Sequence, residues 1–406
     1  MAVGLHDFPL IPEIKGVRIG VAEAGIKKPN KKDIVIFELC EGASVVGVFT
    51  QNAFCAAPVR VCQKHLGLAG SRYLLINTGN ANAGTGKSGL FAALKSCEAL
   101  AAQVDVGVES ILPFSTGVIG EPLPVDKIIT AIPAALANLS GSNWHAAGVG
   151  IMTTDTLPKG SIRTFEFEGK VYTIAGISKG AGMIRPNMAT MLGYVCSDIA
   201  MNVDILQAIL KSVVNKSFNR ITVDSDTSTN DSCIAVATGM AGNLVVTSVD
   251  QPLAQAFVVA FTEVMQELAH AIVRDGEGAT KFVTVEVIGA VNESDATKTA
   301  FEIAHSPLVK TALFASDPNW GRILAVVGRA GVSELDVDLV QLHINGFEIA
   351  RDGCRSPDYI EEHGKLAMTP QEIHICVDLG MGEASDIVWT TDFSHEYVTI
   401  NAEYRT

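Results

Sequence analysis

The chain has 406 residues, of which 48% are hydrophobic and 18% are charged, and its formal net charge is −14. A chain of this length and composition buries enough apolar surface to fold without disulfides or metals, which excludes a disordered protein. Because phosphates attract basic surfaces, the acidic balance argues against nucleic acid and anionic membranes as partners, while a local cationic pocket stays compatible with it.

Short strands and amphipathic helices are predicted along the whole chain. In chain order they are strands at 34–40, 45–49 and 73–77, helices at 89–103 and 126–139, a hairpin at 165–174, helices at 203–216 and 252–273, a strand at 282–288, a hairpin at 342–350 and a strand at 373–378. The strands are rich in β-branched or aromatic residues, and the helices repeat apolar residues every three or four positions. The elements follow no regular β-α-β rhythm and no linker divides the chain, so the pattern predicts an α/β protein with an α+β layered fold.

The sequence also bears on where the protein is located and whether it binds a metal. The first residues carry no basic segment followed by an apolar core, so we expect no secretory signal, and no run of about 18 apolar residues predicts a membrane span. Eight scattered cysteines without a CxxC pair are typical of a reduced cytoplasmic protein. The nine histidines show no HxH or HxxxH spacing, so we expect no metal site.

Five polar clusters interrupt the hydrophobic pattern, at 77–84, 115–120, 179–190, 224–231 and 274–280, and all but the one at 224–231 contain glycine. Each alone is compatible with an ordinary turn, but glycine also lets backbone amides approach a ligand closely and face developing negative charge. None matches GxxxxGK[ST], or GxGxxG after a strand, so a nucleotide phosphate loop is not expected. Together the clusters indicate a ligand site of another kind.

Thr190 follows a small residue, Ala189, at the end of a stretch containing glycine and proline. The sequence has no GxSxG elbow and no cysteine in a catalytic context. An internal threonine is a poor nucleophile, but a chain-terminal threonine carries its own base, an α-amino group with a pKa near 8. Attack of the hydroxyl on the Ala189 carbonyl and hydrolysis of the resulting ester would expose that amine. The alternative is a threonine that merely begins a strand at 190–196.

The segment 179–192, KGAGMIRPNMATML, closely resembles the self-cleavage motif of the ornithine acetyltransferase family, also called bifunctional glutamate N-acetyltransferase / amino-acid acetyltransferase. Further motifs match in family order at 152–159, 226–231, 275–281, 316–322 and 401–406, so the resemblance covers essentially the whole chain. The family often has glycine where Ser225 stands and another residue at Arg185. These departures affect turns and leave the nucleophile intact.

The resemblance implies a fold of the N-terminal-nucleophile-like class and self-cleavage between Ala189 and Thr190. The products would be an α chain, residues 1–189, and a β chain, residues 190–406, assembled as two of each. Thr116 and Gly117 would form the oxyanion hole, which stabilises a tetrahedral intermediate. The substrate would contact Thr153, Lys179, Thr190, Glu277, Asn401 and Thr406.

The implied reaction is a ping-pong acetyl transfer of arginine biosynthesis in the cytoplasm, from N-acetylornithine to Thr190 and then to glutamate. Lys179 would meet a substrate carboxylate and Glu277 the ornithine ammonium, with no metal and no bound organic cofactor. A close alternative is the bifunctional enzyme, which also accepts acetyl-CoA. A more distant one is an amide hydrolase or aminopeptidase with the same threonine chemistry, and a third is an amino-acid-binding protein without turnover.

Overall fold

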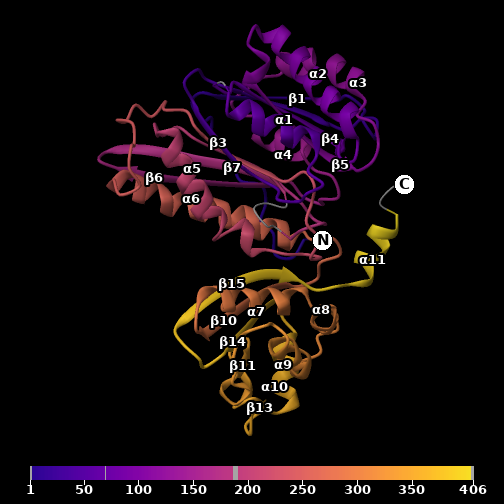
Figure 1. Cartoon of the computed structure of the whole chain (residues 1–406), viewed down its shortest axis with the longest axis vertical. Helices are drawn as coiled ribbons and strands as arrows, with labels where there is room; N and C mark the ends of the chain where they lie inside the picture. Colours follow the sequence, from indigo (N-terminus) through magenta and orange to yellow (C-terminus); the bar gives the residue numbers. More distant parts are fainter. Residues whose placement is uncertain (1, 69, 186–190, 404–406) are drawn as a thin grey trace.

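The structure, a computed structural model, describes residues 2–68, 70–185 and 191–403. Two β-sheets stack face to face in the upper body, and helices cover the outer face of each (Figure 1). A third sheet with its own helices forms a lower part, residues 282–391. The arrangement confirms the prediction of a layered α/β fold.

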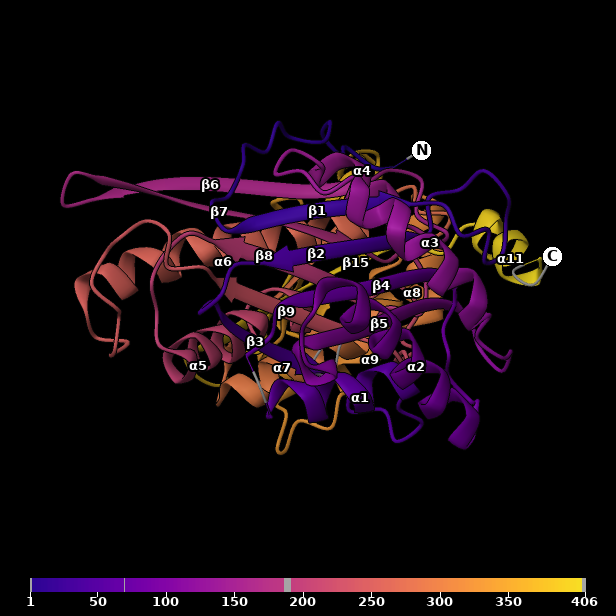
Figure 2. The ribbon, with the colours of Figure 1, turned by 90° about the horizontal axis from the view of Figure 1, so that it is seen from above.

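The first sheet has the strand order β1-β2-β4-β5. Its bounds are β1 (Val17–Ala22), β2 (Ile34–Leu39), β4 (Tyr73–Asn80) and β5 (Ile111–Val118). All neighbours are antiparallel except β4 and β5, which run parallel. The outer face is covered by α1 (Ala57–Leu66), α2 (Gly86–Val104) and α3 (Val125–Ala137), as Figure 2 shows from above. The short helix α4 (Trp144–Gly150) leads into the second sheet.

The second sheet has the order β3-β9-β8-β7-β6. Its strands are β3 (Ser44–Phe49), β6 (Lys159–Phe167), β7 (Lys170–Lys179), β8 (Leu192–Ser197) and β9 (Ser232–Ala237), and its covering helices are α5 (Val203–Val214) and α6 (Pro252–Arg274). Between the two sheets, the Tyr194 ring packs 5.5 Å from Phe37 and 5.3 Å from Phe114. Because β8 is covered on both faces, all six of its residues are buried, and it is apolar nearly throughout.

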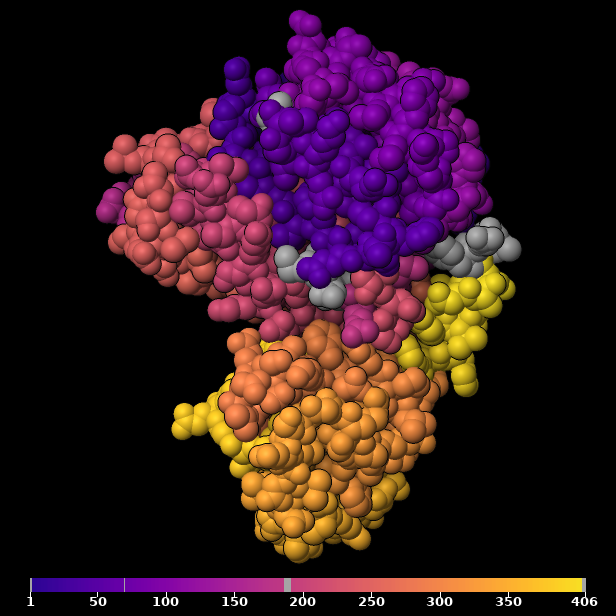
Figure 3. All heavy atoms as spheres, in the orientation of Figure 1, coloured from indigo at the N-terminus to yellow at the C-terminus, as the bar shows by residue number. Residues whose placement is uncertain are grey.

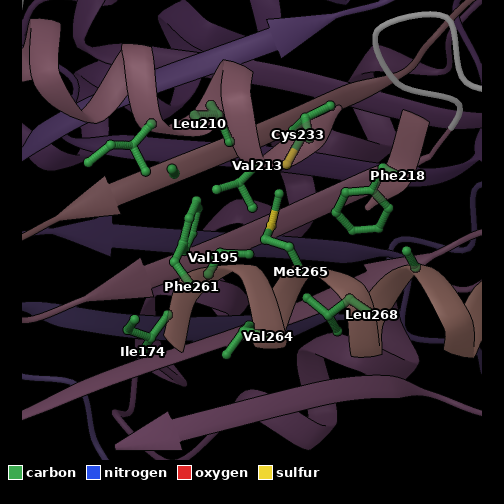
Figure 4. Close-up of a cluster of buried hydrophobic side chains, with 14 of the residues drawn as sticks. Ile174, Val195, Leu210, Val213, Phe218, Cys233, Phe261, Val264, Met265 and Leu268 are labelled. Atoms are coloured by element: carbon green, nitrogen blue, oxygen red, sulfur yellow. The ribbon is translucent and has the colours of Figure 1, made fainter. Parts of the chain in front are cut away.

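The opposite face of the second sheet packs against α5 and α6 in a continuous apolar cluster (Figure 4). Val195 contributes from the sheet, Leu210 from α5, and Phe261 and Met265 from α6. Among the described residues, α6 is the one helix long and apolar enough to cross a membrane, and 56% of its most apolar window is buried inside the molecule. The packing identifies α6 as a core helix.

The lower part contains a six-stranded sheet of order β13-β12-β11-β14-β10-β15. Its elements are β10 (Phe282–Ala290), α7 (Glu293–His305), α8 (Pro307–Phe314), α9 (Trp320–Gly328), β11 (Gln341–Ile344), β12 (Phe347–Arg351), β13 (Cys354–Arg355), α10 (Glu361–Met368), β14 (Glu372–Asp378) and β15 (Ala384–Thr391). It has a separate hydrophobic cluster. After β15 the chain returns to the side of the upper body as α11 (His395–Ala402), which is the yellow helix in Figure 1 and lies among the yellow spheres at the right of Figure 3.

Most predicted elements are found within a few residues of their expected bounds. Both predicted hairpins turn where expected, with positive φ at Glu168 and Gly169 (48° and 74°) and at Asn345 and Gly346 (46° and 80°). The strand expected at 190–196 is β8, which begins at Leu192, and residue 190 lies outside the described residues. The separate lower part was not predicted, because no change in composition marks its start.

Candidate active site

One cavity of about 260 Å³ brings together all six predicted site residues that the structure describes. They come from strand ends, a loop and the C-terminal helix: Thr116, Gly117, Thr153, Lys179, Glu277 and Asn401. The other three predicted positions, Ala189, Thr190 and Thr406, lie outside the described residues. The cavity is therefore assembled from five segments that are far apart in the sequence.

The end of β5 forms one wall, at Thr116 and Gly117. Gly117 has a φ of +136°, and a Cβ there would lie 2.5 Å from the Asn80 nitrogen of β4 and overlap the Gly79 carbonyl. Only glycine allows β4 and β5 to approach this closely. The preceding carbonyl, of Ser115, accepts a 2.9 Å hydrogen bond from Asn230 Nδ2, which fixes the strand end.

Lys179 ends β7 and is buried, with 8% of its surface exposed. Burial lowers its pKa, and the Asp155 carboxylate opposes that shift. Asp155 also accepts hydrogen bonds from the backbone N–H groups of Thr153 (3.0 Å) and Gly180 (2.7 Å). One buried carboxylate thus fixes the Thr153 loop against the end of β7, where the Lys179 side chain lines the cavity.

Behind this wall, Lys159 Nζ lies 2.6 Å from a carboxylate oxygen of Asp155 and 2.6 Å from one of Asp275. All three side chains are fully or almost fully buried. Asp275 also accepts a 2.9 Å hydrogen bond from the Thr156 N–H. Burial raises the pKa of Asp155, but Lys159 and Lys179 outweigh it, so this pKa lies well below its usual range. The buried ion cluster joins the Thr153 loop to the loop that carries Glu277.

Glu277 also lines the cavity and is 6% exposed. Its N–H donates to the Ala181 carbonyl at 2.8 Å, and its Oε2 accepts 2.8 Å from Asn401 Nδ2 of α11. A Cβ at Gly182 would overlap the Glu277 carboxylate, so the glycine-rich stretch after β7 allows this approach. The cavity lining therefore contains one basic and one acidic side chain, Lys179 and Glu277, which suits a zwitterionic amino-acid ligand.

Two further carboxylates were not predicted as site residues. Asp224 accepts hydrogen bonds from the N–H groups of Met183 (2.6 Å) and Ile184 (2.8 Å), so it fixes the backbone of these two residues. Asp231 is 2% exposed, and its Oδ2 has no hydrogen-bond partner among the described residues. Burial raises the pKa of Asp231 well above its usual value, and the Lys179 charge lowers it in part. Both lie in the polar cluster at 224–231, and Asp231 also ends a motif that matches the family, but no site role was predicted for either residue.

The described residues include no group of three or more His, Cys, Asp or Glu side chains that could hold a metal ion. The sequence model of the ArgJ family matches residues 18–406. The chain belongs to the ArgJ family. It is 56% identical to the arginine biosynthesis bifunctional protein ArgJ of Pseudomonas syringae pv. tomato and 55% identical to that of Pseudomonas fluorescens, over 406 residues and the full length of each protein. Family membership confirms the recognised resemblance.

Solved ArgJ structures are similar to parts of this chain. One, from Bacillus halodurans, is 36% identical and covers 52% of this chain and 97% of its own, with a TM-score of 0.49. Another, an ornithine acetyltransferase from Mycobacterium tuberculosis complexed with ornithine, is 30% identical and covers 43% of this chain and 94% of its own, with a TM-score of 0.39. As a member of the ArgJ family the chain is an enzyme of acyl transfer, and the prediction of a glutamate N-acetyltransferase is confirmed.

Proposed function

We propose that this ArgJ protein cuts itself between Ala189 and Thr190 and then transfers acetyl groups through Thr190. The cut would give chains of residues 1–189 and 190–406, assembled as two of each in the cytoplasm. The observation that carries the proposal is the single cavity lined by all six described site residues, next to the strand that begins at Leu192. Those residues come from segments spread over most of the sequence, from Thr116 to Asn401.

Self-cleavage requires a nucleophile, an electrophile and water. The Thr190 hydroxyl attacks the Ala189 carbonyl carbon, the amide nitrogen leaves with a proton, and an ester joins the two residues. Water then hydrolyses this ester, releasing the Ala189 carboxylate and a Thr190 with a free α-amino group. That amine can take the hydroxyl proton in the next reaction, which an internal threonine cannot arrange for itself.

Acetyl transfer then takes two half-reactions. The ornithine nitrogen is the leaving group in the first, and the Thr190 oxygen is the leaving group in the second. The Thr190 oxygen attacks the acetyl carbon of N-acetylornithine, and the α-nitrogen of ornithine leaves with the proton. The glutamate nitrogen next attacks the acetyl ester, and the Thr190 oxygen regains a proton. Thr116 and Gly117 would donate to the oxyanion in both steps, and loss of one such donor costs about 3 kcal/mol in other enzymes.

Charge placement in the cavity supports an amino-acid substrate. Lys179 would bind the carboxylate common to ornithine and glutamate derivatives, and Glu277 the side-chain ammonium of ornithine. The Mycobacterium tuberculosis relative complexed with ornithine is consistent with this assignment. Because Asn401 donates to Glu277, the C-terminal helix would set the orientation of that carboxylate.

The experiment that tests the proposal is intact mass and N-terminal sequencing of the purified protein, combined with substitution of Thr190. We expect two fragments, one beginning at Thr190, in place of one chain of 42.8 kDa. Thr190→Ala should remain uncut and inactive, whereas Thr190→Ser, which keeps a hydroxyl, should still be cut. An uncut and active wild-type protein, or processing that persists in Thr190→Ala, would refute the mechanism.

The hydrolase alternative differs in its acceptor. An amide hydrolase would pass the acetyl group to water, so it would release free acetate at the rate at which it consumes N-acetylornithine. A transferase forms N-acetylglutamate in proportion to the donor consumed. Comparing the two products in one assay distinguishes these functions, and the paired charges in the cavity favour the transferase.

A further inference from the structure

The proposed self-cleavage needs a base that the acetyl transfer does not. The cut takes place before the α-amino group of Thr190 is free, and the nitrogen of an intact amide cannot take the hydroxyl proton. A side chain elsewhere in the fold therefore has to accept it. Asp231, directly before β9, is a buried carboxylate that no step of the proposed acetyl transfer uses.

The backbone of Asp231 is held next to the start of β8. The strands β8 and β9 run parallel here, and the Ser232 N–H donates to the Met191 carbonyl at 2.9 Å. On the other side, the Asp231 carbonyl accepts a 3.0 Å hydrogen bond from the Thr50 N–H. Consecutive Cα atoms of a chain are about 3.8 Å apart, so the peptide bond before Thr190 cannot lie far from Met191. The bond to be cut is therefore close to the first residues of β9.

Asp231 lines a small cavity of about 30 Å³ together with Met191. Thr116, Lys179 and Gly182 line both this cavity and the candidate active-site cavity. Its volume is sufficient for a water molecule. Asp231 and Lys179 are the charged side chains among the described residues of its lining. The small cavity thus combines a carboxylate, a cation and space for water beside the residue that follows Thr190.

The Asp231 carboxylate is only partly hydrogen-bonded. Its Oδ2 atom is buried and has no hydrogen-bond partner among the described residues. Burial raises the pKa of Asp231, whereas a hydrogen bond with Ser228 and the charge of Lys179 lower it in part. A carboxylate with a raised pKa takes up a proton more readily than an ordinary one. Glu277, the acidic residue of the active-site cavity, accepts a hydrogen bond from Asn401 and does not line the small cavity.

We propose that Asp231 is the general base of the self-cleavage, which carries the proton of the Thr190 hydroxyl to the leaving nitrogen and then activates the water that hydrolyses the ester. This inference rests on the proposed function and deepens it. It assigns a catalytic residue to the reaction that creates the active enzyme. Once the cut is made, the α-amino group of Thr190 takes over as the base of acetyl transfer.

The two steps regenerate the carboxylate and consume only water. In the first, Asp231 takes the hydroxyl proton as the Thr190 oxygen attacks the Ala189 carbonyl carbon. The same proton passes to the amide nitrogen as the C–N bond breaks, which leaves an ester and a free amine. In the second, Asp231 takes a proton from the water that attacks the ester, and it returns this proton to the Thr190 oxygen as the C–O bond breaks.

The test measures the rate of self-cleavage in newly made full-length protein. The wild type and the variants Asp231→Asn, Asp231→Ser and Asp231→Glu are produced by cell-free synthesis, and the uncut chain is followed over time by gel electrophoresis and mass spectrometry. Asparagine and serine remove the base, so we expect cleavage to slow about 100-fold or more. Glutamate keeps a carboxyl group and should be cleaved about tenfold or more faster than asparagine.

Asp198→Asn is the matched control. Asp198 directly follows β8, at the end of the strand away from Met191, and its carboxylate accepts a 3.0 Å hydrogen bond from the Thr173 N–H. Burial raises the pKa of Asp198, as it does for Asp231. The control should be cleaved at the wild-type rate, because its carboxyl group is at the other end of the strand.

Two further measurements distinguish a missing base from a folding defect. Uncut Asp231→Asn should unfold on heating within about 5 °C of Thr190→Ala, which is also uncut but keeps the carboxylate. The rate of N-acetylglutamate formation per cut molecule should fall by less than about tenfold, because the α-amino group of Thr190 is the base in that reaction.

Failure of this inference is distinguishable from failure of the proposed function. A wild type that is never cut would refute the proposed function itself. A cut wild type, with cleavage at the wild-type rate in either folded variant that lacks the carboxyl group, would overturn the role of Asp231 alone. An equal loss of cleavage and of acetyl transfer per cut molecule in Asp231→Asn would also overturn it, because the carboxylate would then support the fold of the whole site.

Discussion

At the scale of single residues, the site depends on a cation that never contacts the cavity. Lys159 is 1% exposed and pairs with both Asp155 and Asp275. The pairs connect the loop of Thr153 with the loop of Glu277, two segments more than a hundred residues apart. Removing such a cation leaves two buried carboxylates without compensation, and this costs far more than the pair contributes when intact.

We therefore expect Lys159→Met to destabilise the protein by about 3–5 kcal/mol and to reduce acetyl transfer sharply. Methionine keeps most of the side-chain volume, so the loss reports the charge. Lys170→Met, at an exposed lysine of the neighbouring strand, should change the free energy of unfolding by less than about 0.5 kcal/mol. Urea denaturation of both variants measures the difference, and similar values for the two would contradict the role of the buried cluster.

The same cluster should make the stability of the folded protein decrease at acid pH. The folded pKa of Asp155 lies below the ordinary value of 3.8, because Lys159 and Lys179 outweigh the effect of burial. Its stabilising contribution is therefore complete above pH 3.8 and is lost as the pH falls below it. In Lys159→Met this acid-induced loss should be smaller, since part of the charge that lowers the pKa is gone.

At the scale of elements, sequence patterns predict those helices, strands and turns whose formation depends on neighbouring residues. The hairpin at Asn345-Gly346 forms as expected, because both residues adopt the positive φ that a two-residue turn requires. β5 was not predicted, since Pro113 interrupts its apolar run, but β5 is an edge strand and tolerates the missing N–H donor. α7 was also missed, because its buried face consists mainly of small residues such as Ala296 and Ala300.

The candidate site was also only partly predictable from the sequence, because some of its contacts depend on the tertiary fold. The family resemblance implied Thr116, Lys179 and Glu277 as members of one site, and all three line one cavity in the structure. Neither spacing nor composition indicated that Lys159 would pair with Asp275, because that contact depends on how the second sheet packs against the loop after α6. Long-range pairs of this kind leave no periodic signal in a single sequence.

The C-terminal helix, α11, contributes to the cavity without contributing to the core. None of its residues is buried, and Ser394 caps its first turn. We expect deletion of residues 401–406 to lower N-acetylglutamate formation about tenfold or more while changing the free energy of unfolding by less than about 1 kcal/mol. The reason is the loss of the Asn401 amide that orients Glu277.

A full-length variant controls for the deletion. Asn401→Asp keeps the shape of the side chain but replaces the donor with a carboxylate facing Glu277, so it should lose activity without losing helix α11. Thermal unfolding and steady-state rates are measured for both proteins. Wild-type turnover in the truncated enzyme would show that the last residues lie outside the working site.

At the scale of the whole molecule, the upper body and the lower part meet at a half-buried histidine. His270, on α6, packs its ring 4.4 Å from Trp389 of β15 and 5.4 Å from Phe282 of β10. Its Nε2 is buried and has no hydrogen-bond partner among the described residues. A neutral imidazole suits this junction, whereas a protonated one would bury a charge among aromatic rings.

Burial lowers the pKa of His270 to about 4, and Arg274 acts in the same direction, against Glu267 and Glu372. The unfolded chain, with a pKa near 6.5, binds this proton more readily than the folded protein between pH 6.5 and 4. Stability therefore falls on acidification by about 1.4 kcal/mol per pH unit within that window. His305, whose pKa burial lowers to about 3, adds a loss of the same sign.

Replacing His270 by phenylalanine tests this junction, because the ring remains while the titrating group is removed. Between pH 7.5 and 5.5 the variant should lose about 1 kcal/mol less of its free energy of unfolding than the wild type, with the share of His305 retained. Urea denaturation at both pH values gives the difference directly, so any change in packing that is independent of pH cancels. Identical pH dependence in the two proteins would mean that the imidazole is already protonated, or exposed to water, where the upper body and the lower part meet.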